Sequence, residues 1–123
     1  MKKYTCKIVK GKGRGGPVVG FPTINLEIPS DFKQKEGVYA CKVFLDGKEY
    51  LGALHYGAAP TFDESELVLE IYLLDYGADN TPSTELSFEI GTYLRPVATF
   101  MDPTALHTQI SMDVARIRRR SSQ

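Results

Sequence analysis

Apolar side chains recur at every second position in several short stretches of the chain, which is the spacing of half-buried β-strands. The first alternation covers residues 4–9, and a short extended piece follows at residues 23–26. Residues 37–57 contain two runs of β-forming residues joined by Asp46-Gly47, a pair that is favoured in type I′ turns. This segment therefore predicts a β-hairpin.

Two further strands are predicted in the second half of the chain. Residues 65–76 read as a strand that is apolar on both faces, and residues 83–96 place Leu86, Phe88 and Ile90 on one face. About six short strands separated by turn signals favour an antiparallel barrel or sandwich over a βαβ sheet. If the sheet closes into a barrel, the doubly apolar strand implies that something covers its outer face.

The last segment has the pattern of an amphipathic helix and is the predicted cover. Asp102 is placed to cap its N-terminus, and Pro103 suits the first helical position. One apolar stripe follows at helical spacing, formed by Leu106, Ile110, Val114 and Ile117. Cations in the last turn suit the helix dipole, and RNA contact is the minority alternative for these side chains, which are Arg116, Arg118, Arg119 and Arg120.

Composition narrows the class of protein. The 123 residues include 15 Lys plus Arg and 15 Asp plus Glu, so the net charge of zero gives no broad attraction to nucleic acid or to an acidic membrane. We expect a single domain over residues 1–123, without a membrane span or a secretory signal, because the long apolar runs of both are absent. Cys6 and Cys41 lie in strand-like segments, which favours buried thiols in a reducing cytoplasm over the alternative of a disulfide.

A glycine-rich stretch precedes the second predicted strand. Gly11, Gly13 and Gly16 fit the pattern G-x-G-x-x-G. A dinucleotide-binding loop must open a helix, which Pro17 and residues 18–22 cannot begin, and the further motifs of protein kinases and Walker loops are absent. Two interpretations stay open: backbone N–H groups that bind a phosphate, or a glycine-rich surface turn.

Three polar residues are candidates for chemistry. Thr23 and Asn25 share one face of an extended chain and offer hard oxygen ligands that suit Mg²⁺, although an ordinary strand has the same spacing. Glu70 shares a strand face with apolar neighbours, so it is either a proton acceptor with a raised pKa or a solvated outward glutamate. His55 and His107 lack partners at metal-ligand spacing, which predicts structural or surface roles.

Several segments resemble one known family in the same order along the chain. GKGRGGPVVGFPTINL resembles the nucleotide loop and Pro-Thr-Ala-Asn motif of riboflavin kinases (flavokinases), with Ile24 in place of alanine. GVYACKV is similar to the family's Gly-Val/Ile-Tyr strand, and LEIYLLDY to its Leu-Glu-Val-His-Leu-Leu-Asp segment. YLRPVATFMDPTALHTQISMD is similar to its Leu-Arg-Pro, Phe and C-terminal helix pattern, so the resemblance covers nearly the whole chain.

The resemblance implies an all-β fold with a C-terminal helix, a six-stranded antiparallel Greek-key β-barrel. It also implies transfer of the ATP γ-phosphate to the riboflavin 5′-hydroxyl, giving FMN and ADP. Thr23 and Asn25 would hold nucleotide phosphates and Mg²⁺, with Zn²⁺ or Mn²⁺ as alternative metals. Glu70 would accept the hydroxyl proton, and Arg95 and Phe100 would lie on the flavin side. The backbone lining the nucleotide would be that of Gly11, Gly13, Gly15 and Gly16.

The chain departs from the family pattern at identifiable places. Tyr72 stands where a histidine is common, HYGAAPTF lacks an asparagine or arginine before its proline, and GADNTPSTEL replaces an Asp-Leu-Tyr-Gly turn that bears on flavin binding. Bacterial relatives often carry an N-terminal adenylyltransferase; because this chain begins at Met1 without one, we expect its product to be FMN, unless it is a piece of a longer protein. We also expect a monomer. The competing functions are a non-catalytic flavin or nucleotide sensor and an RNA-binding barrel. The RNA-binding alternative is disfavoured because the sequence does not show the aromatic stacking face that single-strand binders use.

Overall fold

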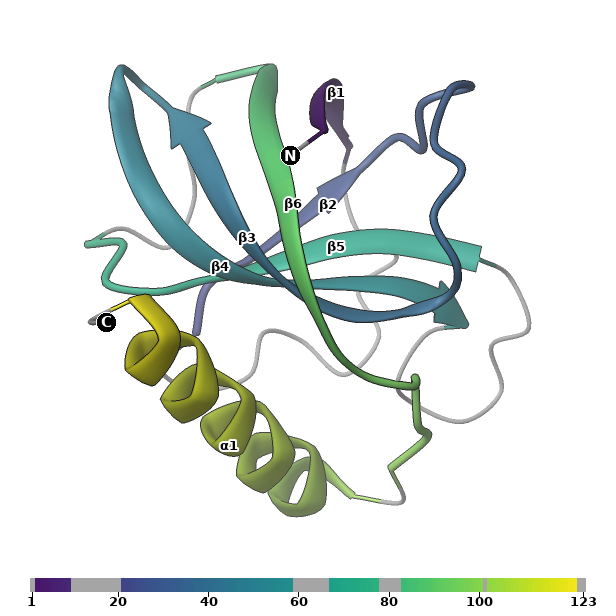
Figure 1. Cartoon of the computed structure of the whole chain (residues 1–123), viewed down its shortest axis with the longest axis vertical. Coiled ribbons are helices and arrows are strands. Elements are labelled where there is room, and N and C mark those ends of the chain that lie inside the picture. Colours follow the sequence, from purple (N-terminus) through teal and green to yellow (C-terminus); the bar gives the residue numbers. More distant parts are fainter. Residues whose placement is uncertain (1, 10–20, 59–66, 78–82, 101, 122–123) are drawn as a thin grey trace.

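The fold is a barrel of six strands with one helix packed on its outside (Figure 1). The computed structural model describes residues 2–9, 21–58, 67–77, 83–100 and 102–121. Their elements are β1 (Lys3–Val9), β2 (Thr23–Leu26), β3 (Gly37–Leu45), β4 (Lys48–Ala58), β5 (Leu67–Leu73), β6 (Glu85–Arg95) and α1 (Pro103–Ser121). Every strand coincides with a segment that the sequence predicted to be extended. The glycine-rich stretch lies outside the described residues, as does most of the turn before β6.

All neighbouring strands are antiparallel, and the sheet closes on itself in the order β1-β2-β5-β4-β3-β6. Strands β3, β4 and β5 are successive neighbours, and β6 returns to lie beside β3, which is the Greek-key arrangement. The predicted barrel is therefore confirmed over the alternative of a sandwich. Closure leaves no free sheet edge among these strands.

The β3–β4 hairpin turns at the predicted residues. Asp46 and Gly47 both have positive φ values, 53° and 76°. A two-residue type I′ turn needs positive φ at both central positions, because this geometry matches the right-handed twist of the flanking strands. The Asp-Gly pair thus confirms the hairpin and sets the register of β3 against β4, in which Leu45 faces Lys48.

The barrel interior is filled by every second side chain of the strands. Val43, Leu54, Ile71, Leu73 and Phe88 are all fully buried in this interior cluster. Cys6 and Cys41 are also buried in it as free thiols, the arrangement that the sequence favoured. Burial, helped by the nearby charge of Asp31, raises the pKa of Cys6 to about 11.

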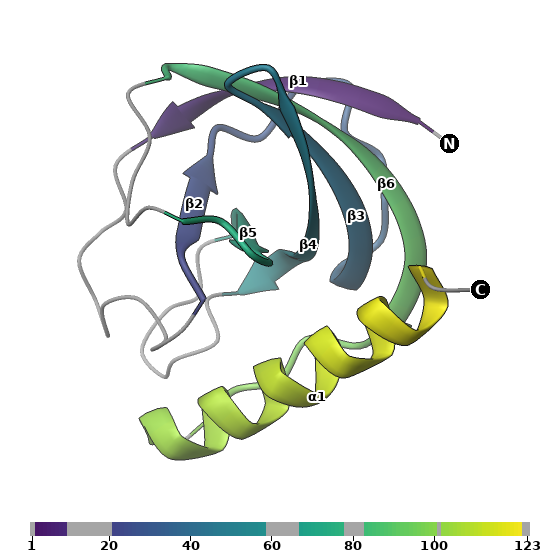
Figure 2. The same ribbon diagram turned by 90° about the vertical axis from the view of Figure 1, so that its left-hand side faces the viewer.

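Helix α1 covers the outer face of the barrel, as Figure 2 shows from the side. Its predicted apolar stripe packs against outward-facing side chains of the strands, including Val38, Ala53, Tyr72, Leu74 and Leu94. This cover explains why β5 is apolar on both faces. The cap is also confirmed, since Oδ1 of Asp102 accepts a hydrogen bond from the backbone N–H of Ala105 at 2.8 Å.

Two of the arginines near the end of α1 are held by the barrel. Nη1 of Arg116 donates to the carbonyl oxygen of Leu94 at 3.0 Å. Arg118 makes a bidentate pair with the exposed carboxylate of Asp75, at 2.8 and 2.9 Å. In the part of the chain that the structure describes, no helix has the length and apolar character needed to cross a membrane.

Candidate active site

The strand register aligns a row of side chains across the outer face of the barrel. Asn25 of β2 lies opposite Glu70 of β5, Glu70 opposite His55 of β4, His55 opposite Val38 of β3, and Val38 opposite Arg95 of β6. Directly paired residues present their side chains on the same face of a sheet. These five residues, called the outer row below, therefore share the face on which α1 packs.

Glu70 is a half-buried carboxyl group in the middle of this face. Burial raises its pKa to about 7, while a hydrogen bond from the Tyr72 hydroxyl to Oε1 at 3.3 Å acts in the opposite direction. A carboxyl group that titrates near neutrality can take up and release a proton at physiological pH. Of the two interpretations of the sequence, the structure supports a desolvated acid over a solvated glutamate.

Thr23 and Asn25 lie on the strand next to Glu70. They are directly opposite Tyr72 and Glu70, and both are half-buried, whereas Ile24 between them belongs to the interior cluster. The Thr23 hydroxyl donates to the carbonyl oxygen of Phe21 at 3.4 Å, which is a long bond. The structure thus brings the threonine–asparagine pair and the acid side by side, although they are 45 or more positions apart in the sequence.

The oxygen donors of this site suit one kind of metal. Among the described residues there is no group of three or more His, Cys, Asp or Glu side chains that could hold a metal ion. The hydroxyl of Thr23 and the amide oxygen of Asn25 are unlike the His and Cys sets that hold Zn²⁺. They fit Mg²⁺, which usually takes few protein ligands and completes its shell with water and phosphate oxygens.

Arg95 joins the barrel to the helix. Its Nη2 and Nε donate to the carboxylate of Asp113 at 2.8 to 3.2 Å, and Asp113 is fully buried. Gln109 donates to the same carboxylate at 3.1 Å. The Arg95 guanidinium carbon lies 6.0 Å from the centre of the Phe100 ring. The assignment of Arg95 and Phe100 to the flavin side stays a prediction, because the Arg95 guanidinium forms an ion pair with Asp113.

A bulge in β6 gives Arg95 its outward direction. The register with β3 shifts between Val38 and Tyr39, so that Tyr39 pairs with Tyr93 and Val38 with Arg95. The extra residue, Leu94, packs in the cluster under α1. Sequence reasoning did not single out Asp113; the available signal was an acid next to Val114, inside the otherwise apolar stripe of the helix.

The two histidines lie in different surroundings, one buried and one on the surface. His55 is buried, and its Nε2 lies 2.7 Å from the carbonyl oxygen of Ala58. Burial lowers the pKa of His55, which favours the neutral ring with Nε2–H as the donor. His107 is exposed on α1, where its ring lies 5.7 Å from that of Phe21, just before β2.

Comparison with known proteins identifies the family. The family model described as "Flavokinase: Riboflavin kinase" matches residues 2–121. The bifunctional riboflavin kinase/FMN adenylyltransferase of Listeria monocytogenes is 32% identical over 114 residues, which are 89% of this chain and 36% of that protein. The trifunctional protein RibF/MnmA of Mycoplasmoides gallisepticum is 30% identical over 107 residues, 86% of this chain and 16% of that protein.

A solved structure shares the same fold. The crystal structure of a macrolide-efflux protein from Streptococcus pneumoniae superimposes with a TM-score of 0.78 and 23% identity, covering 94% of this chain and 38% of that one. This chain therefore spans little more than a third, or less, of the proteins that it matches. Because the family match runs through the barrel, the Glu70 strand and the covering helix, the chain belongs to the riboflavin kinase (flavokinase) family.

Proposed function

We propose that this chain transfers the γ-phosphate of ATP to the 5′-hydroxyl of riboflavin, yielding FMN and ADP. The observation that carries the proposal is the direct pairing of Glu70 with Asn25 across β5 and β2, inside a chain of the riboflavin kinase family. This pairing sets a proton acceptor beside the two residues that the family motif relates to phosphates and metal. It is the convergence that phosphoryl transfer to a hydroxyl requires.

In the proposed reaction Glu70 acts as the general base. A bond forms between the riboflavin 5′-oxygen and the γ-phosphorus, the bond from this phosphorus to the oxygen bridging the β- and γ-phosphates breaks, and the hydroxyl proton moves to the Glu70 carboxylate. A pKa of about 7 leaves a substantial ionised fraction at neutral pH. Such a carboxyl group also holds the proton it receives more readily than an ordinary glutamate, whose pKa is near 4.3.

Beyond proton transfer, the reaction requires that the nucleotide is positioned and that the negative charge of its phosphates is neutralised. Thr23 and Asn25 would hold Mg²⁺ together with the phosphates, and Mg²⁺ when bound neutralises negative charge on the transferring group. Backbone N–H groups of the glycine-rich stretch would line the nucleotide; this stretch, with Gly11, Gly13, Gly15 and Gly16, lies outside the described residues.

The proposal extends to the flavin and to the state of the protein. Arg95 and Phe100 are proposed to lie on the flavin side. The chain is proposed to act as a monomer in a reducing cytoplasm.

The direct test is to incubate the purified chain with riboflavin and Mg·ATP and to separate the flavins by chromatography. We expect FMN to accumulate, with one ADP formed per FMN. A matched incubation without Mg²⁺ controls for the metal requirement. If riboflavin binds, as followed by its fluorescence, and no FMN forms, the chain is a flavin sensor and the kinase proposal is wrong.

Replacing Thr23 by valine should weaken the use of Mg·ATP. The exchange keeps the β-branched shape on β2 and removes the hydroxyl oxygen, so we expect KM for Mg·ATP to rise about tenfold, the scale of one lost charge-assisted contact. The measurement is the initial rate of FMN formation over a series of Mg²⁺ and ATP concentrations.

The control for this exchange is Thr5→Val. Thr5 is exposed on β1, where its hydroxyl bonds that of Ser87 at 2.9 Å, and its backbone partner is on β6 and not on β2 or β5. Its kinetics should match those of the unaltered chain. Normal rates for Thr23→Val at low Mg²⁺ would remove Thr23 from the metal site.

A further inference from the structure

Tyr72 is a buried tyrosine whose hydroxyl forms a hydrogen bond with the Glu70 carboxylate. Only 4% of the residue is exposed, and its ring packs in the cluster between α1 and the barrel. The two residues are two positions apart on β5, so both side chains lie on the outer face. The hydroxyl donates to Oε1 of Glu70 at 3.3 Å.

The ring of Tyr72 is fixed much more firmly than the carboxylate that it contacts. Tyr72 lies opposite Ala53 on one side and Thr23 on the other, and α1 closes over it. The helix is in turn tied to β6 by the buried pair of Arg95 and Asp113. A half-buried glutamate, by contrast, has three rotatable side-chain bonds and much rotamer freedom to lose.

We propose that Tyr72 is a positioning residue that holds the Glu70 carboxylate in the orientation needed to receive the substrate proton. The hydrogen bond engages Oε1 and leaves Oε2 to meet the riboflavin hydroxyl. This role rests on the proposed kinase function and adds to it a residue that touches neither phosphate nor metal. The phenol donates to the carboxylate in its ionised form, which is the form that accepts the substrate proton.

The competing explanation is that Tyr72 only fills the space under α1. The two explanations differ in what the hydroxyl does, because the ring is needed in both. Tyr72→Phe keeps the ring and removes the hydroxyl, and therefore separates them. A residue that acts through Glu70 has no further effect once Glu70 has lost its function, whereas a residue that only packs has the same effect in both backgrounds.

The experiment is a double-mutant cycle on FMN formation with Tyr72→Phe, Glu70→Gln and the two combined. We expect Tyr72→Phe alone to lower kcat about tenfold, with KM for riboflavin and for Mg·ATP unchanged within about twofold, as for a lost hydrogen bond to a charged group. In the Glu70→Gln background the same exchange should change kcat by less than about twofold. Equal losses in both backgrounds, or an unchanged kcat in the single variant, would overturn the proposal.

Tyr39→Phe is the matched control. Tyr39 is equally buried, in the barrel interior, and its hydroxyl donates to the carbonyl oxygen of Lys35 at 2.6 Å. This variant loses the same chemical group from a comparable site without touching Glu70. We expect its kcat to equal that of the unaltered chain, and thermal unfolding of each variant checks that the fold persists.

A second readout separates this inference from the proposed function. With ¹³C-labelled glutamate, the Glu70 carboxyl resonance is assigned by its absence in Glu70→Gln. At a pH at which the carboxyl is ionised, Tyr72→Phe should shift this resonance and Tyr39→Phe should not. A chain that makes no FMN but shows this shift would refute the kinase function and keep the contact; an unmoved resonance would refute the positioning role in either case.

Discussion

Replacing Glu70 by glutamine is expected to lower kcat for FMN formation by about 10²- to 10⁴-fold, the usual contribution of a positioned general base. Glutamine has nearly the same shape and can still accept the hydrogen bond from Tyr72, but it cannot take a proton from the riboflavin hydroxyl. Because the exchange leaves Thr23 and Asn25 intact, KM for Mg·ATP should stay within about twofold. Steady-state rates at saturating riboflavin measure both quantities.

The pH dependence of kcat/KM is a second test of Glu70 as the general base. With a pKa of about 7, Glu70 loses its ability to accept a proton as the pH falls through this value, so kcat/KM of the unaltered chain should decline below about pH 7. The profile of Glu70→Gln should lack this acidic limb, because its amide does not titrate. A limb that survives the exchange would belong to another group and would exclude Glu70 as the base.

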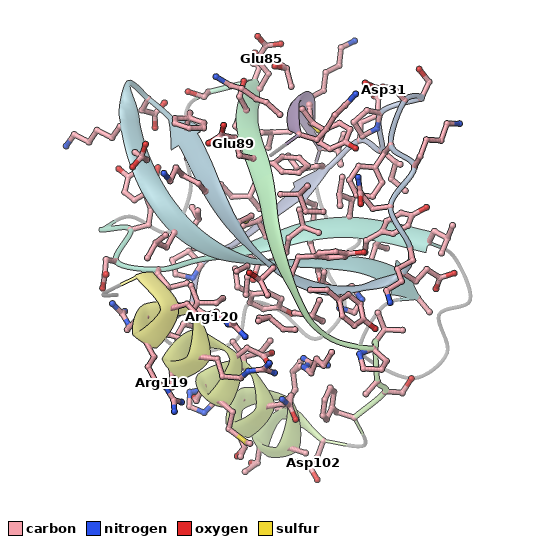
Figure 3. All side chains as sticks on the ribbon, in the orientation of Figure 1. Asp31, Glu85, Glu89, Asp102, Arg119 and Arg120 are labelled. Atoms are coloured by element: carbon pink, nitrogen blue, oxygen red, sulfur yellow. The ribbon has the colours of Figure 1, made fainter. Side chains whose placement is uncertain are left out.

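The matched control is Glu89→Gln. Glu89 is also a half-buried, outward-facing glutamate on a strand, at the end of the barrel away from α1 (Figure 3). It lies opposite Lys3 and Lys42 and has no part in the proposed site. Its kcat and its pH profile should equal those of the unaltered chain, so that any loss in Glu70→Gln is due to the position and not to removing a charge.

Replacing Asp113 by alanine is expected to cost about 3–5 kcal/mol of the free energy of unfolding, because it leaves the Arg95 guanidinium uncompensated in a largely buried place. Asp113 is fully buried and Arg95 is 15% exposed, so little water can take over the lost contacts. Gln109 loses its acceptor as well. Urea unfolding followed by circular dichroism measures the difference.

Two further variants test this explanation. Arg118→Met removes the ion pair with Asp75, whose side chains are 49% and 72% exposed, and should change the stability much less, since exposed pairs contribute little. Changing Arg95 to methionine in the Asp113→Ala background should restore part of the lost stability by removing the unpaired charge. An unchanged urea midpoint for Asp113→Ala would show that the buried pair does not hold the helix.

The local parts of this fold could be predicted from the sequence because their causes are local. Alternation of apolar residues gave the strands, the Asp46-Gly47 pair gave the hairpin turn, and Asp102 with its following stripe gave the capped helix. Each of these signals acts over a few positions, through dihedral preference or side-chain period. The same kind of signal marked Thr23 and Asn25 as neighbours on one strand face.

The candidate site was predicted only in its parts. Glu70 drew attention as an acid among apolar neighbours, but a carboxylate on the second face of a strand has the same pattern whether it meets water or a covering helix. Its desolvation, and thus its raised pKa, comes from its burial in the closed barrel, where it lies between Asn25 of β2 and His55 of β4. The bulge that turns Arg95 outward and the pair that it forms with Asp113 left no pattern that the sequence analysis used.

The sequence by itself determined which segments become strands, where the chain turns, and where a helix begins, because these depend on residues that are close together in the chain. Only the tertiary structure decided that β5 pairs with β2, that Asn25 then lies opposite Glu70, and that Tyr72 contacts the carboxylate from beneath α1. Strand order and register depend on the closing of the whole barrel, in which each pairing is fixed by its burial against all the others.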